Sequence, residues 1–303
     1  MSGTVKPMPS ARIPMSDPTT RFDAMAFAQN LVVRGLIGFA LILPYRLRVP
    51  LLGALMRHVF GPIAGYKRRA LNNLALIWPY MPLAARHKIA VQALDNAGRS
   101  LIENYSTRAF TARQAGVVPT GAGVAALHAA MAAGRPVILV SGHFGNYEAA
   151  RACLVARGAR IGGLYRPMAN RYFNAHYVQT MAAFGGPIFA TGRAGTAGFV
   201  RHLKSGGLLV LLFDQSAAGE TLDFLGKPAQ TALSAAELAL RYGADLIPFY
   251  GTRQPDGLTF AVELEAPIAP TTALEMTQAL TRSLEARVRA HPGQWFWIHR
   301  RWK

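Results

Sequence analysis

Apolar and polar positions divide this chain of 303 residues into a helical first part and an alternating second part. Residues 24–44 are almost continuously apolar, and apolar positions recur at helical spacing over 67–82, 84–106 and 123–133. From residue 136 onward, short aliphatic runs that are typical of strands take turns with helical segments. This alternation predicts an α/β fold: a single largely parallel or mixed sheet flanked by helices, with an N-terminal hydrophobic membrane-associating helix.

The predicted strands cover residues 136–141, 160–165, 187–190, 208–213, 246–250 and 259–264. The predicted helices cover residues 146–157, 170–184, 195–204, 232–242 and 273–290. Between them, residues 219–226 hold Phe224 and Leu225 between glycines, which predicts a loop that forms a lip over an apolar ligand. We expect a disordered leader over residues 1–22, a membrane-associating helical region over 23–60 and one globular domain over 61–303.

The apolar segment 24–44 allows two membrane interpretations. It is long enough to span a bilayer, which takes about 20 helical residues. Arg34 at its middle opposes spanning, because a central arginine costs roughly 2.5–3.5 kcal/mol on insertion scales. The alternatives are an interfacial helix lying among lipid headgroups and a buried core helix. Arg46 and the basic residues after it predict that the rest of the chain stays on the cytoplasmic side of an inner membrane.

The charge of the chain limits the classes of binding partner that we expect. The net charge is +18, the isoelectric point is about 10.9, and 51% of the residues are hydrophobic with a mean hydropathy of +0.18. Such a chain fits polyanionic partners, and its apolar content favours an anionic membrane surface over nucleic acid. Its basic residues are dispersed, whereas a nucleic-acid-binding module would cluster them, so we expect no nucleic-acid partner. The single cysteine, Cys153, excludes an internal disulfide.

The segment from Pro136 to Glu148 carries the strongest chemical signal. It predicts a buried strand, a turn that contains His143 between Gly142 and Gly145, and a helix with Glu148 in its first turn. At the carboxyl end of a parallel strand, a histidine beside a carboxylate can act as a general base. We therefore expect His143 to accept a proton and Glu148 to orient the imidazole. The alternative is a histidine that caps the helix or binds a loop carbonyl.

Two further strands end on charged residues at the same expected edge. Arg166 follows the strand 160–165, where a guanidinium can hold a phosphate or a carboxylate. Asp214 follows the most apolar strand, and either Arg166 or His143 is a plausible partner for it. The alternatives are a surface arginine and an aspartate that caps a turn. His and Cys positions show no metal-ligand spacing, and the P-loop, dinucleotide-binding and serine-elbow patterns are missing from the sequence.

These residues together resemble the late acyltransferases of bacterial lipid A biosynthesis, of the lauroyl/myristoyl type, within the glycerolipid acyltransferases that share a His-x4-Asp/Glu signature. The matching segments lie in the same order along the chain: His143–Glu148, Tyr165–Pro167 with Asn170, Asp214–Gln215, Gly219–Gly226 and Gln294–Lys303.

The resemblance implies an O-acyltransferase with a His143–Glu148 dyad, no metal and no cofactor. It would move a fatty acyl chain from acyl carrier protein or acyl-CoA to a hydroxyl of a lipid A precursor, an anionic membrane glycolipid, at the inner membrane. The resemblance also implies substrate-binding roles for Arg166, Asn170, Asp214, Gln215 and Arg300. Backbone N–H groups near Gly145 are the expected donors to the developing oxyanion.

Two rival functions remain open. The acceptor can be another membrane lipid, such as a phosphatidylinositol mannoside, an ornithine lipid or a lysophospholipid. A membrane-bound hydrolase would use the same histidine and acid to activate water, and it would release fatty acid without any acceptor.

Overall fold

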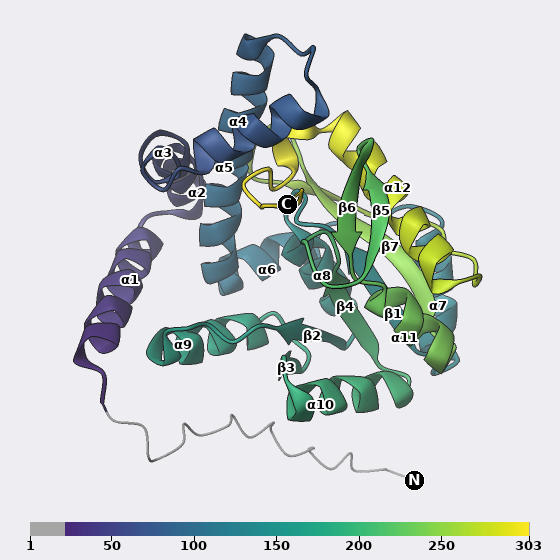
Figure 1. Cartoon of the computed structure of the whole chain (residues 1–303). Coiled ribbons are helices and arrows are strands. Elements are labelled where there is room, and N and C mark those ends of the chain that lie inside the picture. The colour runs from purple at the N-terminus through teal and green to yellow at the C-terminus, as the bar shows by residue number, and fades with distance from the viewer. Residues whose placement is uncertain (1–21, 303) are drawn as a thin grey trace.

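A six-stranded, mostly parallel sheet forms the centre of the molecule in the computed structural model, which describes residues 22–302 (Figure 1). The strand order is β3-β2-β4-β1-β7-β8, and only the β7–β8 pair is antiparallel. The strands are β1 (Val137–Ser141), β2 (Ile161–Tyr165), β3 (Ile188–Ala190), β4 (Leu208–Leu212), β7 (Asp245–Arg253) and β8 (Phe260–Leu264). The predicted fold class and all six predicted strands are confirmed.

The central strand β1 is buried on both faces, as its unbroken aliphatic run predicts. Ile138 and Val140 point into one hydrophobic cluster, which also contains residues of α5, α11 and α12. Val137 and Leu139 point into a second cluster on the other face, formed with α7 and α8. Helices therefore cover both faces of the sheet, and the functional residues can only be reached at its edges.

The helices of the second part lie close to their predicted ranges. They are α7 (Gly123–Ala132), α8 (Tyr147–Val155), α9 (Arg171–Ala182), α10 (Arg193–Lys204), α11 (Ser234–Tyr242) and α12 (Ala273–Ala290), followed by the short 3-10 helix η2 (Pro292–Gln294). Thr272 and Glu275 form a capping box at the start of α12, which explains its sharp beginning.

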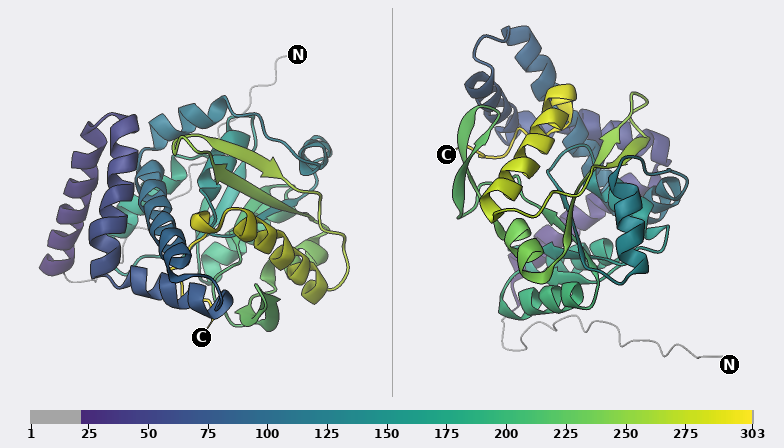
Figure 2. Two further views of the ribbon diagram at one scale, coloured as in Figure 1. Left: turned by 90° about the horizontal axis from the view of Figure 1, so that it is seen from above. Right: turned by 90° about the vertical axis from the view of Figure 1, so that its right-hand side faces the viewer.

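The N-terminal part is entirely helical. Its elements are α1 (Ala24–Ile42), α2 (Tyr45–Leu55), the π-helix η1 (Met56–Phe60), α3 (Gly61–Ile63), α4 (Tyr66–Ile77), α5 (Leu83–Tyr105) and α6 (Thr107–Ala115). The long helix α5 contacts α2, α4 and η2, and so joins this part to the sheet domain. α1 lies at the outer edge, on the far side of α5 from the sheet (Figures 1 and 2). The predicted leader falls outside the described residues, except for Phe22.

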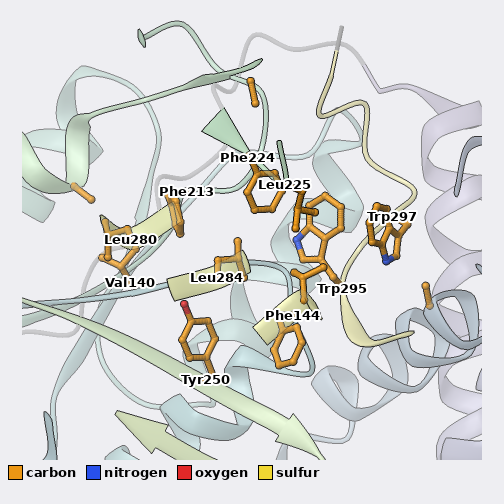
Figure 3. Packing of buried hydrophobic residues seen from close by; sticks show 14 of the residues in the cluster. Val140, Phe144, Phe213, Phe224, Leu225, Tyr250, Leu280, Leu284, Trp295 and Trp297 are labelled. Carbon is orange, nitrogen blue, oxygen red and sulfur yellow. The ribbon is translucent and has the colours of Figure 1, made fainter. Parts of the chain in front are cut away.

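The predicted lip is wrong, because residues 219–231 form a β-hairpin, β5 (Glu220–Phe224) and β6 (Lys227–Thr231). Its turn places Leu225 and Gly226 at positive φ, 57° and 79°, as a tight two-residue hairpin turn requires. Phe224 and Leu225 are buried beside the Trp295 ring in the main core (Figure 3). Their apolar side chains therefore stabilise the protein core and do not cover a ligand.

Candidate active site

His143 lies two residues beyond β1, at the carboxyl edge of the sheet, where β4 ends beside it. Its side chain is 26% exposed. The turn from β1 into α8 is held by Asn146, whose side chain accepts a hydrogen bond from the Glu148 backbone N–H as the N-cap of α8. The predicted strand–turn–helix arrangement around His143 is confirmed.

The two glycines beside His143 permit close approaches that a side chain would block. A Cβ on Gly142 would lie 2.7 Å from Leu284 and 3.0 Å from the Asp214 carboxylate. Gly145 has a φ of +54°, and a Cβ there would lie 2.0 Å from the Gly251 carbonyl oxygen. Glycine at these positions therefore lets α12, β7 and Asp214 pack against the turn.

Asp214 is the carboxylate that holds His143. Its Oδ1 lies 2.8 Å from His143 Nδ1, and its Oδ2 accepts the His143 backbone N–H at 2.8 Å. The indole Nε1–H of Trp295 also donates to Oδ2, at 2.9 Å. Asp214 is only 3% exposed, so these donors replace the water that the carboxylate loses on burial. Of the two partners predicted for Asp214, the structure pairs it with His143.

The contact between His143 and Asp214 shifts the pKa of each group in the direction that favours an ion pair. Burial lowers the pKa of His143, but the charge and hydrogen bond of Asp214 outweigh this and raise its pKa above the usual value. Burial raises the pKa of Asp214, but His143 and Trp295 outweigh it and lower that pKa below its usual value. Because Nδ1 faces Asp214, Nε2 is the ring nitrogen that can take a proton from a substrate.

Glu148, the predicted partner of His143 in the dyad, contacts Arg151 instead of His143. Its side chain forms a buried ion pair with Arg151, with Oε2 and Nη1 3.2 Å apart. Arg151 also donates to the backbone oxygens of Ile161 and Gly185, so the pair ties α8 to β2 and to the loop before β3. Among the described residues Glu148 makes no hydrogen bond with His143. The geometry thus gives the orienting role to Asp214, while Glu148 remains a neighbour of the same cavity.

A cavity of about 570 Å³ opens in front of His143. Arg166 and Gln215 line it as predicted, and Gln215 Nε2 lies 3.4 Å from His143 Nε2. Arg166 is exposed and makes no hydrogen bond or ion pair with any residue in the described range. A smaller cavity of about 190 Å³, between α5 and the turn that follows η2, is also lined by His143. His143 therefore borders two cavities.

Two predicted substrate-binding residues lie elsewhere. Asn170 caps α9, accepting the backbone N–H groups of Tyr172 and Phe173, and its amide donates to the Ala26 carbonyl oxygen of α1 at 2.7 Å. Asn170 thus joins two helices. Arg300 is exposed and does not line either cavity beside His143.

The predicted oxyanion donor near Gly145 is also occupied. The Gly145 N–H donates to the Gln294 carbonyl oxygen at 2.9 Å, and the Asn146 N–H donates to Gly251 at 3.0 Å. These N–H groups are not free for a substrate oxygen.

The sequence pattern did not reveal the contribution of the C-terminal segment to the site. Phe144 and Trp295 form an antiparallel bridge, and the Phe296 N–H donates to the His143 carbonyl oxygen at 3.0 Å. Trp295, Trp297 and Trp302 pack with Phe224 in one aromatic cluster. The dense aromatic sequence at 295–302 is typical of a buried segment, but no local pattern indicates that Trp295 contacts Asp214.

Fold and site together define a class: an α/β enzyme in which a histidine, oriented by a buried aspartate at the edge of the sheet, can activate a hydroxyl or water. In the described part of the chain, no group of three or more His, Cys, Asp or Glu side chains is placed to hold a metal ion.

Comparison with known proteins narrows this class. The family described as bacterial lipid A biosynthesis acyltransferase matches residues 19–303, so the chain belongs to this family and is an acyltransferase. It is 26% identical to the lipid A biosynthesis lauroyltransferase of Escherichia coli K12, over 78% of this chain and 80% of that protein. It is 24% identical to a phosphatidylinositol mannoside acyltransferase of Mycobacterium tuberculosis, over 76% and 75% of the two chains. A lipid A biosynthesis acyltransferase of Haemophilus influenzae is also 24% identical, over 84% and 81%.

Proposed function

We propose that this protein moves a fatty acyl chain from acyl carrier protein, or from acyl-CoA, to a hydroxyl of a lipid A precursor. We place the reaction at the inner membrane, with the catalytic domain on the cytoplasmic side. The observation that carries the proposal is the Asp214-oriented imidazole of His143 facing a cavity, in a chain of this family. The positive net charge supports an acidic carrier protein and a phosphorylated lipid as partners, and nucleic acid has no part in the reaction.

In the proposed mechanism, His143 Nε2 takes the proton of the acceptor hydroxyl as its oxygen attacks the thioester carbonyl. The tetrahedral intermediate then collapses, the carbon–sulfur bond breaks, and the imidazolium returns its proton to the leaving thiolate. Asp214 holds the reactive tautomer and stabilises the imidazolium. General-base catalysis of this kind contributes about 10²–10⁴-fold to the rate. Neither a metal nor a cofactor has a role in this scheme.

Arg166 and Gln215 are the proposed substrate-binding residues. The Arg166 guanidinium has no protein partner in the described chain, so it is available to a phosphate of the acceptor or of the pantetheine arm. The Gln215 amide lies beside His143 Nε2, where the hydroxyl and the thioester carbonyl must meet. It can donate to the oxygen on which negative charge develops.

A second candidate acceptor follows from the relatives. The similarity to phosphatidylinositol mannoside acyltransferases is almost as high as that to the lipid A enzymes. A phosphatidylinositol mannoside is therefore the first alternative acceptor, and an ornithine lipid or a lysophospholipid is a further one.

Mass spectrometry of lipid A from cells with and without the gene tests the acceptor. We expect the loss of one acyl chain without the gene, and restoration by the wild-type gene but not by His143→Ala. Unchanged lipid A would rule out this acceptor, and profiling of the other lipids would then identify the alternative. The purified enzyme with labelled acyl carrier protein or acyl-CoA tests the donor, and fatty-acid release without an acceptor would indicate the hydrolase instead.

A further inference from the structure

Helix α1 has two faces of different character. Asn30 and Ala40 are buried on the side that meets the rest of the protein, and Ile37 on the same side is partly covered. The opposite side carries large apolar side chains that are all more than half exposed: Leu31, Val32, Leu36, Phe39 and Ile42. α1 is the one helix in the described range that is long and apolar enough to cross a membrane, yet only 11% of its apolar stretch is buried.

Polar contacts fix α1 to α9. Asn170 donates to the Ala26 carbonyl oxygen, and the Asp23 N–H donates to the Tyr172 hydroxyl at 3.2 Å. The rings of Phe27 and Tyr172 also meet edge to face, with centroids 5.3 Å apart.

Arg34 follows Asn30 by one helical turn and therefore lies on the same side of α1. Burial lowers the pKa of His176 on α9, and the positive charge of Arg34 lowers it further. Asn30 is thus buried against the protein and Arg34 lies on the same side of α1, whereas the outward side carries the large apolar residues.

The next elements along the chain also carry exposed apolar side chains. Leu47 and Leu51 on α2, Val59 and Phe60 on η1, and Ile63 on α3 are exposed to 40–82%. The sequence from residue 24 to 94 contains nine Lys and Arg residues and no Asp or Glu. An apolar surface within a purely cationic segment is complementary to a bilayer that contains anionic lipid.

We propose that α1 lies flat in the headgroup region of an anionic bilayer while it stays docked on α9, and that α1, α2, η1 and α3 form one membrane-binding face. Spanning would require α1 to leave α9, because α9 carries polar residues such as Arg171, Asn174 and Gln179 that cannot enter hydrocarbon with it. The contacts of Ala26 and Asp23 would break, and the buried Asn30 would lose its protein surroundings. Flat binding keeps all of these contacts.

The proposal also explains how a lipid acceptor reaches His143. Tyr177 and Met181 of α9 line the cavity in front of His143. The helix that holds α1 at the membrane is therefore a wall of that cavity. This deepens the proposed function, because it predicts that an acceptor lipid enters beside α9 without leaving the membrane surface.

Cysteine labelling tests the orientation of α1. Phe22→Cys and Arg46→Cys place one thiol at each end of α1, and the wild-type chain, with only buried Cys153, measures the background. In sealed vesicles with the cytoplasmic face outward, we expect an impermeant maleimide to label both positions before detergent is added. Labelling of Arg46→Cys alone, with Phe22→Cys reacting only after detergent, would show a spanning helix and overturn the proposal.

A vesicle-binding experiment tests whether the apolar side of α1 contributes to the proposed membrane-binding face. The double variant Leu36→Gln/Phe39→Gln should bind vesicles containing phosphatidylglycerol at least tenfold more weakly than wild type. The matched control is Leu240→Gln/Leu274→Gln, which changes two leucines exposed to 40% and 46% on α11 and α12 and should bind normally. Equal binding by wild type and the Leu36/Phe39 variant would contradict the proposal. Acyl transfer to a detergent-dispersed acceptor should survive in both variants, so a failure of the proposed reaction would be seen separately.

Discussion

At the scale of single residues, the site depends on one carboxylate that serves three donors. Asp214 binds the imidazole Nδ1, the backbone N–H of His143 and the indole of Trp295. The first bond selects the tautomer that leaves Nε2 unprotonated, and the other two keep the carboxylate ionised and in place. Removal of the charge and removal of one donor therefore have different consequences.

Asp214→Asn should lower kcat by about 10²–10⁴-fold, because the imidazolium loses the charge that stabilises it. The pH dependence should also change. The folded-state pKa of His143 is raised by Asp214, so wild-type kcat/KM should fall as the pH drops below this raised value. Without the charge, burial alone acts on His143, and the acid limb should move to lower pH. A pH–rate profile with an unmoved acid limb would show that Asp214 does not set the titration of His143.

Trp295→Phe removes the indole N–H and keeps an aromatic ring. The Asp214 pKa should rise and the carboxylate should hold the His143 proton more strongly, so the acid limb of kcat/KM should move to higher pH. We expect a loss of roughly tenfold in kcat/KM, since hydrogen bonds to charged groups contribute about 1.5–3 kcal/mol.

Trp297→Phe is the matched control for Trp295→Phe, because the Trp297 indole donates to the Pro292 carbonyl oxygen and Asp214 is not its partner. It should lower the melting temperature without moving the pH profile. A similar shift in both variants would indicate a general loosening of the core and would contradict the assignment of Trp295 as a positioning residue.

At the scale of elements, Glu148 and Arg151 connect α8 to its neighbours. Their side chains are 5% and 2% exposed, so either charge alone would be buried without its partner. Glu148→Gln should lower the free energy of unfolding by about 3–5 kcal/mol, the typical cost of breaking a buried ion pair. The double variant Glu148→Gln/Arg151→Met should recover part of this loss, because it removes both charges.

Denaturant unfolding of Glu148→Gln, of Arg151→Met and of the double variant measures the coupling between Glu148 and Arg151. Additive losses would show that the pair is not coupled. If Glu148→Gln were as stable as wild type but inactive, the carboxylate would act directly in the reaction, as the signature spacing predicted.

At the scale of the whole molecule, a net charge of +18 should guide acidic partners to the enzyme. We expect kcat/KM with acyl carrier protein as donor to fall about tenfold when the ionic strength rises from about 0.02 to 0.3 M, since added salt shortens the range of electrostatic attraction. A neutral acyl thioester of N-acetylcysteamine is the control and should show little change. Equal salt dependence for the two donors would argue against electrostatic recognition of the carrier.

Local sequence patterns predicted the six strands of the central sheet in their order along the chain and the position of His143 after the first of them. Period-two and unbroken aliphatic runs, helical spacing and glycine turns are local properties, so they predicted β1, β4 and the turn before α8 closely. The hairpin β5–β6 was missed because each of its strands has only one or two buried apolar residues, Leu222 and Phe224 in β5 and Ala229 in β6. α2 lies inside the predicted helical region 23–60, whereas α6 was not predicted, because this short helix receives its stability from packing on α8.

Which side chains contact one another depends on the tertiary structure. Glu148 is five residues from His143 and Asp214 is 71 residues away, yet Asp214 holds the imidazole, because β1 and β4 are neighbours in the sheet and both end at this edge. In the same way, the packing of the C-terminal segment brings Trp295 to Asp214, and the packing of α1 against α9 brings Ala26 to Asn170. Spacing along the chain constrains local geometry, but hydrogen bonds between distant segments depend on strand order and helix packing, which no local pattern specifies.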